Sequence, residues 1–151
     1  MDRIRALIRG YEGKSKHVYL DSEGNWTVGC GHFLTDEERL NVLTHPLWTD
    51  REIETLFEHD FKVALEDFAA VFGQQEMAEA RKGALVDMLF NMGRSKFLKF
   101  YDMIPAVRAG DWELAAKECL DSRRARKLPT RAAENAEMLR TGEWPDAAAR
   151  L

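Results

Sequence analysis

Apolar residues recur at helical spacing through most of the chain. Near the N-terminus they lie three or four positions apart, at Ile4, Leu7, Ile8 and Tyr11. Asp2 is placed to cap this segment and Gly13 to end it. The pattern predicts a short helix with Glu12 at its C-terminal end.

Two capping boxes predict where the next two helices begin. Thr35 precedes Glu38 by three positions, and Thr49 precedes Glu52 in the same way. In such a box the threonine side chain and the acidic side chain each bind the other residue's backbone N–H group. The second box opens an apolar stripe that meets no helix breaker before Gly73, and a helix of this length can bridge two lobes.

The second half of the chain is predicted to be a helical bundle. Helices are expected over 80–92, over 101–109, from a cap at Asp111 to Leu120, and from Pro129 to Gly142. No internal repeat or low-complexity segment interrupts them, and the stretch at 29–32, GCGH, lacks the length and context of a phosphate-binding loop.

The one clear β signal lies between the first helix and the first capping box. Two short stretches, HVYLD at 17–21 and NWTVG at 25–29, are rich in β-branched and aromatic residues. Ser22, Glu23 and Gly24 separate them, so the stretches predict a β-hairpin.

The composition is that of a globular protein. Of the 151 residues 45% are hydrophobic and 32% are charged, and no stretch approaches the ~20 apolar residues that a membrane span requires. The N-terminus lacks the apolar run of roughly 7–15 residues found in a secretory signal, so we expect synthesis and retention in the cytoplasm. Cys30 and Cys119 are then expected to be reduced, partly buried thiols.

The two halves of the chain carry opposite net charge. Residues 1–80 hold 8 Lys and Arg against 16 Asp and Glu, a net charge of −8, whereas residues 81–151 hold 14 against 10, a net charge of +4. The total of −4 argues against a nucleic-acid-binding protein, because such proteins neutralise phosphates with cations. A basic run near the C-terminus leaves an anionic partner open but is typical of a solvated face; it comprises Arg123, Arg124, Arg126, Lys127 and Arg131.

Glu12 and Asp21 have the properties of a pair of hydrolytic carboxyls. Hydrolysis of a glycosidic bond needs one protonated and one ionised carboxyl group. A helix C-terminus disfavours the charged form of Glu12 and raises its pKa, whereas Asp21 in a polar turn should stay ionised. Thr27 on the returning strand offers a hydroxyl to a water beside Asp21. Spacing alone favours the simpler interpretation, in which the three residues are a solvated helix end, a turn former and a strand filler.

The full pattern resembles the phage-type lysozymes, the family of the T-even and P-type tailed-phage endolysins. Glu12, eight residues, Asp21, five residues and Thr27 are followed by VGCGH, which matches the catalytic Glu, Asp and Thr of that family and its G-x-G-H. The resemblance continues over essentially the whole chain, at FEHD (57–60), ALVDMLFNMG (84–93), SR (122–123), PTR (129–131) and RTGEW (140–144).

The resemblance implies an α+β, mainly α fold in a single catalytic domain spanning 1–151. It comprises a small N-terminal lobe with the hairpin (about 13–48), a long connecting helix (about 50–72) and a larger helical C-terminal lobe (about 76–151, with the helix 2–12). Peptidoglycan is expected in the cleft between the lobes, with the hairpin as one wall.

The resemblance also implies a muramidase that hydrolyses the β-1,4 bond between N-acetylmuramic acid and N-acetylglucosamine with inversion. Glu12 is then the general acid, Asp21 positions or deprotonates a water, and Thr27 helps to hold that water. Inverting geometry leaves roughly 6.5–9.5 Å between the two carboxyl groups, which is room for one water.

Further residues carry over from the resemblance. Arg131 matches an arginine that pairs with the catalytic Glu; it favours the ionised form of Glu12, and we expect burial to prevail over it once sugar excludes water. His32 and Asp60 match a supporting ion pair. Expected contacts with sugar or peptide come from Glu23, Gly31, Phe33, Phe90, Asn91 and Arg123. Phe90 is equally typical of a core aromatic, and Glu23 of an exposed turn residue.

The sequence departs from the T-even enzyme at the rim of the cleft and in charge. Arg124 replaces a Trp, Asp87 replaces an Asn, and the segment between the hairpin and the long helix is shorter, so a different stem peptide is expected. The sequence pI of about 5.6 contrasts with that basic enzyme and predicts weak attraction to the anionic cell envelope.

Neither a cofactor nor a metal is predicted, since Cys30, His32 and the other histidines form no ligand pattern. We expect a monomer without stable membrane association that waits in the cytoplasm for a holin-like pore and then acts on the periplasmic cell wall. Three alternatives stay open: a lytic transglycosylase, which needs the acid but not Asp21 or Thr27; a non-catalytic peptidoglycan-binding module; and a helical DNA-binding protein.

Overall fold

The first half of the chain forms a small sheet and one very long helix. The computed structural model describes residues 1–21, 23–40 and 48–146. In chain order the elements of this half are α1 (Asp2–Glu12), β1 (Ser15–Leu20), β2 (Trp26–Gly29), β3 (His32–Phe33), α2 (Asp36–Leu40) and α3 (Asp50–Phe72). The three strands form an antiparallel sheet in the order β1-β2-β3.

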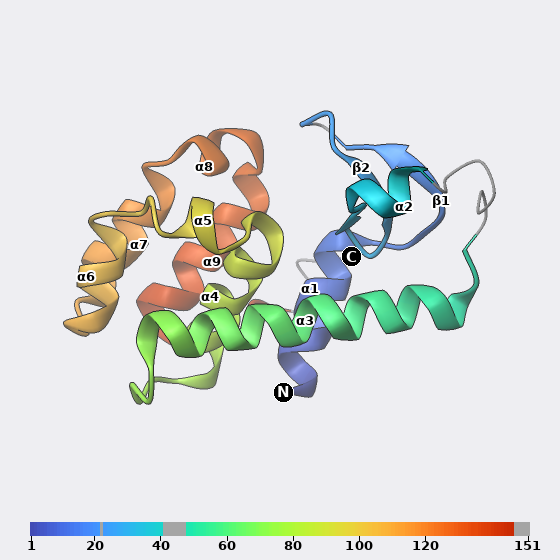
Figure 1. The fold of residues 1–151 in the computed structure, drawn as a ribbon. Coiled ribbons are helices and arrows are strands. Elements are labelled where there is room, and N and C mark those ends of the chain that lie inside the picture. The colour runs from blue at the N-terminus through green and yellow to red at the C-terminus, as the bar shows by residue number, and fades with distance from the viewer. Residues whose placement is uncertain (22, 41–47, 147–151) are drawn as a thin grey trace.

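The second half consists of helices packed on one end of α3. They are α4 (Glu79–Met92), α5 (Arg94–Phe97), α6 (Met103–Arg108), α7 (Trp112–Leu120), α8 (Arg123–Lys127) and α9 (Pro129–Thr141). The sheet and α2 lie over the other end of α3, which thus runs beneath both groups (Figure 1). We call the sheet with α2 the N-terminal lobe and α4 to α9 the C-terminal lobe.

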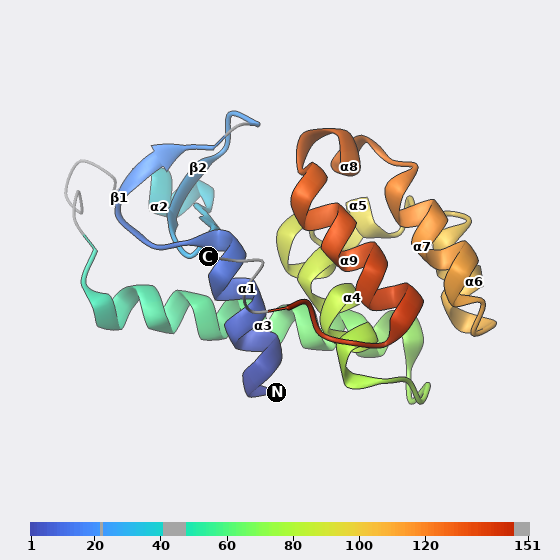
Figure 2. The same ribbon diagram turned by 180° about the vertical axis from the view of Figure 1, so that it is seen from behind.

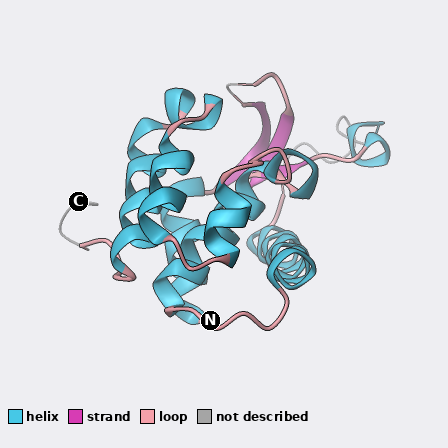
Figure 3. Cartoon of the chain, turned by 90° about the vertical axis from the view of Figure 1, so that its left-hand side faces the viewer, coloured by secondary structure: helices cyan, strands magenta, loops and turns pink. Residues whose placement is uncertain are grey.

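Helix α1 joins the two lobes although it precedes the sheet in sequence. It packs against α4 and crosses α3, as the view from behind shows (Figure 2). Ion pairs of Arg5 with Glu58 and of Arg9 with Glu54 fasten it to α3. The view along α3 shows the helices of the C-terminal lobe in front of the strands (Figure 3). The last residue of α1 therefore lies between the lobes.

Local signals set the ends of the long helix, as predicted. Thr49 caps α3, and the reciprocal hydrogen bonds with Glu52 complete the capping box. Thr35 and Glu38 form the same pair of bonds before α2. Gly73, with φ of 60°, ends α3. The long helix predicted from the apolar stripe is thus confirmed.

One continuous apolar core joins α1, α3 and the C-terminal lobe. Its centre is built from fully buried side chains, among them Ile4, Leu7, Phe57, Phe61, Leu85 and Met88. Phe57 stacks on Phe61, and their ring centroids are 6.1 Å apart. The N-terminal lobe adds few residues to this core.

Several local predictions were wrong. Asp2 is the first residue of α1 rather than its cap, because the helix begins one position earlier, and Asp2 pairs with Arg5 at 3.3 Å. The helix expected from 101 begins at Met103. Strand β3 and the short helices α5 and α8 were not predicted. Cys30 and Cys119 are free as expected, but they are buried rather than partly buried.

The fold is mainly helical with a small antiparallel sheet near the N-terminus and a long helix, as predicted, and the sheet has a third strand in addition to the predicted hairpin. Within the residues that the structure describes, no helix is both long and apolar enough to cross a membrane.

Candidate active site

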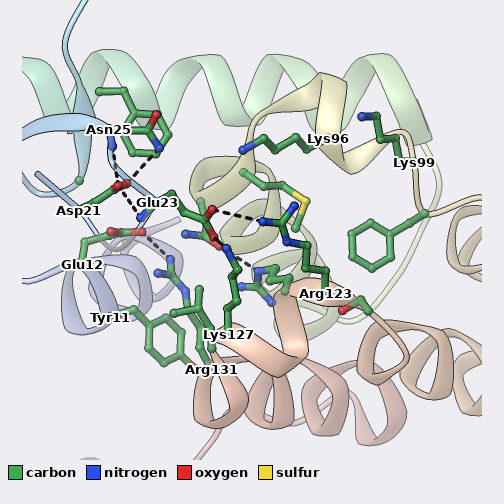
Figure 4. Close-up of a pocket in the computed structure, with 18 of the residues that line it drawn as sticks. Tyr11, Glu12, Asp21, Glu23, Asn25, Lys96, Lys99, Arg123, Lys127 and Arg131 are labelled. Carbon is green, nitrogen blue, oxygen red and sulfur yellow. Dashed lines mark hydrogen bonds and ion pairs between the residues drawn. The ribbon is translucent and has the colours of Figure 1, made fainter.

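A cleft of about 720 Å³ lies between the N-terminal and C-terminal lobes. The end of α1, the strands and the hairpin turn form one side of it, and α5, α8 and the start of α9 form the other. In Figure 4, Glu12 and Asp21 lie on one side, with Lys96, Lys99 and Arg123 on the other.

Glu12 is a nearly buried carboxyl at the last position of α1. Its side chain is 14% exposed, and its Oε1 accepts a hydrogen bond of 2.7 Å from Nη2 of Arg131. Burial raises the pKa of Glu12, and the charge and hydrogen bond of Arg131 oppose this without reversing it. Burial thus prevails before any sugar is bound, so the environment of Glu12 disfavours its ionised form.

Gly31 leaves room for the Glu12 carboxyl. The residue lies in the turn between β2 and β3 with φ of 79°. A Cβ atom at this position would lie 2.4 Å from Oε2 of Glu12 and 2.9 Å from its Cδ. Gly31 therefore serves two needs, a left-handed backbone and close approach to an acid from another element.

Asp21 lies in the hairpin turn, where backbone N–H groups converge on its carboxylate. Its Oδ1 accepts bonds of 2.9 Å from the N–H of Glu23 and 2.8 Å from that of Asn25, and the Asn25 side chain donates to Oδ2 at 3.3 Å. Burial acts to raise the pKa of Asp21, but these hydrogen bonds outweigh it and lower the pKa. Asp21 is therefore ionised, and its Oδ2 accepts fewer hydrogen bonds than its Oδ1.

Thr27 lies in the central strand beside this turn. It pairs with Tyr19 on β1 and with Phe33 on β3, and it is 1% exposed. Its hydroxyl donates to the backbone oxygen of Asn25 at 3.0 Å. Since that hydrogen is engaged, the hydroxyl oxygen can accept a hydrogen bond in the cleft.

Behind Glu12 lies a cluster of buried charged and polar groups. Arg131 donates to both oxygens of Asp87, at 2.6 and 3.1 Å, and Asn135 donates to Asp87 at 3.1 Å. Arg124 approaches Asp87 to 3.5 Å, and its side chain is 8% exposed. The expectation of a solvated basic face is wrong for Arg124 and Arg131, because both turn inward to Asp87.

Two other members of the basic run form ion pairs across the cleft. Lys127 and Arg123 of α8 both pair with Glu23 in the hairpin turn, the latter at 3.9 Å. This bridge links the lobes across the cleft. The charge and hydrogen bond of Lys127 lower the pKa of Glu23.

Most of the residues expected at the site line the cleft, and three do not. Phe33, which is 46% exposed, and Asn91 line it together with those already described. Phe90 instead packs on Phe57, with ring centroids 5.5 Å apart, which favours the core interpretation. His32 and Asp60 form an ion pair of 2.8 Å between the sheet and α3, away from the cleft lining.

Sequence reasoning missed the partners of the site. Asn25 donates a hydrogen bond to Asp21, and Asn135 donates one to Asp87. Nothing in the local sequence predicts a role for either asparagine. Lys96 and Lys99 on and after α5 extend the basic wall of the cleft. Among the described residues, no three His, Cys, Asp or Glu side chains are grouped to hold a metal ion.

Comparison with known proteins places the chain among lysozymes. A model of the family described as Phage lysozyme matches residues 9–134. Two proteins of Dictyostelium discoideum, Probable T4-type lysozyme 1 and Probable T4-type lysozyme 2, are each 26% identical to the chain, over 92% of it and 94% of their own length. The Pre-baseplate central spike protein Gp5 of Enterobacteria phage T4 is 32% identical over 90% of this chain and 27% of its own.

The match extends from within α1 into α9 and so includes Glu12, Asp21, Thr27 and Arg131. The chain belongs to the phage lysozyme family, whose members are glycoside hydrolases of the muramidase class.

Proposed function

We propose that the protein hydrolyses the β-1,4 bond between N-acetylmuramic acid and N-acetylglucosamine in peptidoglycan, with inversion at the anomeric carbon. The observation that carries this proposal is the opposite behaviour of two carboxyls that line one cleft: the pKa of Glu12 is raised and that of Asp21 is lowered. A general acid and a base require this division.

In the proposed reaction Glu12 gives its proton to the glycosidic oxygen, which leaves as the 4-hydroxyl of N-acetylglucosamine. A water attacks carbon 1 of N-acetylmuramic acid from the opposite face, and Asp21 takes the proton that the water loses. Both carboxyl groups return to their starting states when Glu12 takes up a proton from solvent and Asp21 releases one.

The hydrogen bonds around Asp21 favour one position for the attacking water. The free acceptor capacity is on Oδ2 of Asp21 and on the hydroxyl oxygen of Thr27. A water that donates to both has its lone pair free to attack the sugar. Asn25 organises both residues, since its backbone N–H and side chain hold Asp21 and its backbone oxygen holds Thr27.

Among the residues expected to bind sugar or peptide, those that line the cleft support this substrate. Phe33, Asn91 and Arg123 offer an exposed ring, an amide and a cation along the cleft wall. The cell wall is then the target and lysis of the cell the consequence. Access from the cytoplasm through a holin-like pore, and action as a monomer, belong to the same proposal.

The first test compares clearing of outer-membrane-permeabilised Gram-negative cells by the wild type and by Glu12→Gln, which keeps the shape but removes the donated proton. A loss of at least ~100-fold supports the acid role. Glu113→Gln on α7 is the matched control, because that side chain is 79% exposed and lies outside the cleft lining. A wild type that clears no peptidoglycan, or a Glu12→Gln variant as active as the control, would refute the proposal.

The chemistry of the new ends distinguishes the two reactions possible on this fold. Hydrolysis with inversion of a β bond releases the α anomer first, which proton NMR of fresh digests detects. Anhydromuramic ends would show that a hydroxyl of the substrate had replaced water, as in a lytic transglycosylase. A β anomer released first would contradict inversion while leaving hydrolysis in place.

A further inference from the structure

A buried carboxylate lies directly behind the acid. Asp87, on α4, is 0% exposed, and it receives hydrogen bonds from Arg131 and Asn135 of α9. Arg124 of α8 adds an ion pair of 3.5 Å. A charge this deep is tolerated only where it is paired and hydrogen-bonded, and here two arginines and an amide from two further helices supply this.

One guanidinium nitrogen serves both carboxyl groups. Nη2 of Arg131 donates to Glu12 at 2.7 Å and to Asp87 at 2.6 Å, and Nε of Arg131 donates to Asp87 at 3.1 Å. Arg131 thus makes a two-point contact with Asp87 and a one-point contact with Glu12. The two-point contact is the stronger arrangement.

Two carboxyl groups that accept from one guanidinium nitrogen compete for its positive charge. Asp87 has the additional donor Asn135 and the second cation Arg124, whereas Arg131 is the one donor recorded for Glu12 among the described residues. The positive charge of Arg131 is therefore directed more at Asp87 than at Glu12.

We propose that Asp87 is a positioning residue that takes up the charge of Arg131, so that Arg131 orients Glu12 without ionising it. Arg124 is the second cation that faces Asp87. This inference rests on the general-acid role proposed above for Glu12.

The ionisable groups that face Glu12 come from several elements. They are Arg131 of α9, Asp87 of α4, Arg124 of α8, Tyr11 of α1, Tyr19 of β1, Asp21 in the hairpin turn and Cys30 after β2. Of these, Asp87 is the one that shares the guanidinium with Glu12. Its negative charge raises the pKa of Glu12, while the nearby positive charge of Arg124 lowers it.

The signs predict opposite effects for two substitutions. Asp87→Asn removes the negative charge and leaves Glu12 facing two cations, so Glu12 should lose its proton at lower pH. Arg124→Gln removes a cation and should move the loss of the proton to higher pH. The double variant removes one charge of each sign and should return close to the wild type.

The test is the pH dependence of the initial clearing rate at constant ionic strength, expressed relative to the wild type so that effects of pH on the substrate cancel. For Asp87→Asn, the pH at which the rate falls on the alkaline side of the profile (the alkaline limb) should be lower by about one unit. At pH values above this fall the rate should be about tenfold lower than that of the wild type, and at lower pH it should change little. Titration of the Glu12 carboxyl by carbon-13 NMR gives the same shift without activity.

A structural role alone would lower the rate of Asp87→Asn equally at every pH and leave the limb in place, and that result would overturn the inference. If Asp87→Asn does not fold, Arg124→Gln decides: an upward shift supports the inference and an unmoved limb refutes it. The proposed function is tested separately, by the clearing rates of the wild type and of Glu12→Gln. A failure of the present inference can therefore be distinguished from a failure of the proposed function.

Discussion

Gly31→Ala is expected to disable the enzyme while leaving it folded. The added methyl carbon would lie 2.4 Å from Oε2 of Glu12, about 1 Å closer than the 3.4 Å at which ordinary van der Waals contact begins. The carboxyl group is the end of a flexible side chain, so it moves aside by about that distance. Such a displacement disturbs its 2.7 Å bond to Arg131 and its aim at the glycosidic oxygen.

The two costs of this substitution can be separated. An alanine at φ of 79° is strained by about 1–2 kcal/mol, which lowers stability but not the activity of folded molecules. A misplacement of about 1 Å at a reacting group costs about 100-fold in rate. Gly110→Ala is the control for strain alone, because its φ is 70° and nothing lies within 4 Å of the added carbon.

The assay is the initial clearing rate per folded molecule, with the folded fraction taken from urea unfolding followed by circular dichroism. Both variants should lose similar stability, and Gly31→Ala alone should lose about two orders of magnitude in rate. The reasoning is refuted if folded Gly31→Ala clears cells at the wild-type rate, or if Gly110→Ala loses as much activity.

Three further outcomes concern stability. Glu12→Gln should raise the free energy of unfolding at pH 7 but not below about pH 4, because the raised pKa of Glu12 means that the fold disfavours its ionised form; urea titrations at both pH values check this. Burial acts to lower the pKa of His32, but Asp60 and Glu38 outweigh it, and the pKa is raised. The loss of stability in His32→Asn should therefore be largest below about pH 6.5 and smaller at higher pH, which melting temperatures at pH 5.5 and 8.5 would show. Thr49→Ala should cost about 1 kcal/mol in urea unfolding with full activity retained, whereas no loss of stability would mean that the capping box is dispensable.

Elements with strong local signals were predictable from the sequence. The capping boxes at Thr35 and Thr49, the cap at Asp111 and the glycine stop after α9 all lie where the sequence placed them. Each of these signals acts between residues a few positions apart. Strand β3 has two residues that pair only with β2, and α8 is too short and too basic to show an apolar stripe. Neither element is long enough to show a periodic pattern of apolar residues.

The same distinction applies to the cleft. The spacing of Glu12, Asp21 and Thr27 alone did not distinguish them from ordinary turn and strand residues, and they became candidates only because the full pattern, with the VGCGH that follows, resembles phage-type lysozymes. A hairpin that directly follows a helix end keeps such residues close together, and all three line the cleft. The contacts of Asp87 with Arg124 and Arg131 join α4, α8 and α9, and no spacing rule connects them. A basic run therefore looked solvent-exposed although two of its members are buried.

A mainly helical protein gains a specific chemical ability from its small sheet. Inside a helix the backbone N–H groups are already bonded, so a carboxylate there finds few free donors, and a buried one such as Glu12 tends to keep its proton. A hairpin turn has N–H groups to spare, and those of Glu23 and Asn25 both bind Asp21. The opposite pKa shifts of Glu12 and Asp21 thus follow from placing the two carboxyls on different kinds of secondary structure. A second helix end in place of the turn would supply the N–H groups only at its N-terminus, whereas the hairpin also supplies Thr27 on the strand that follows.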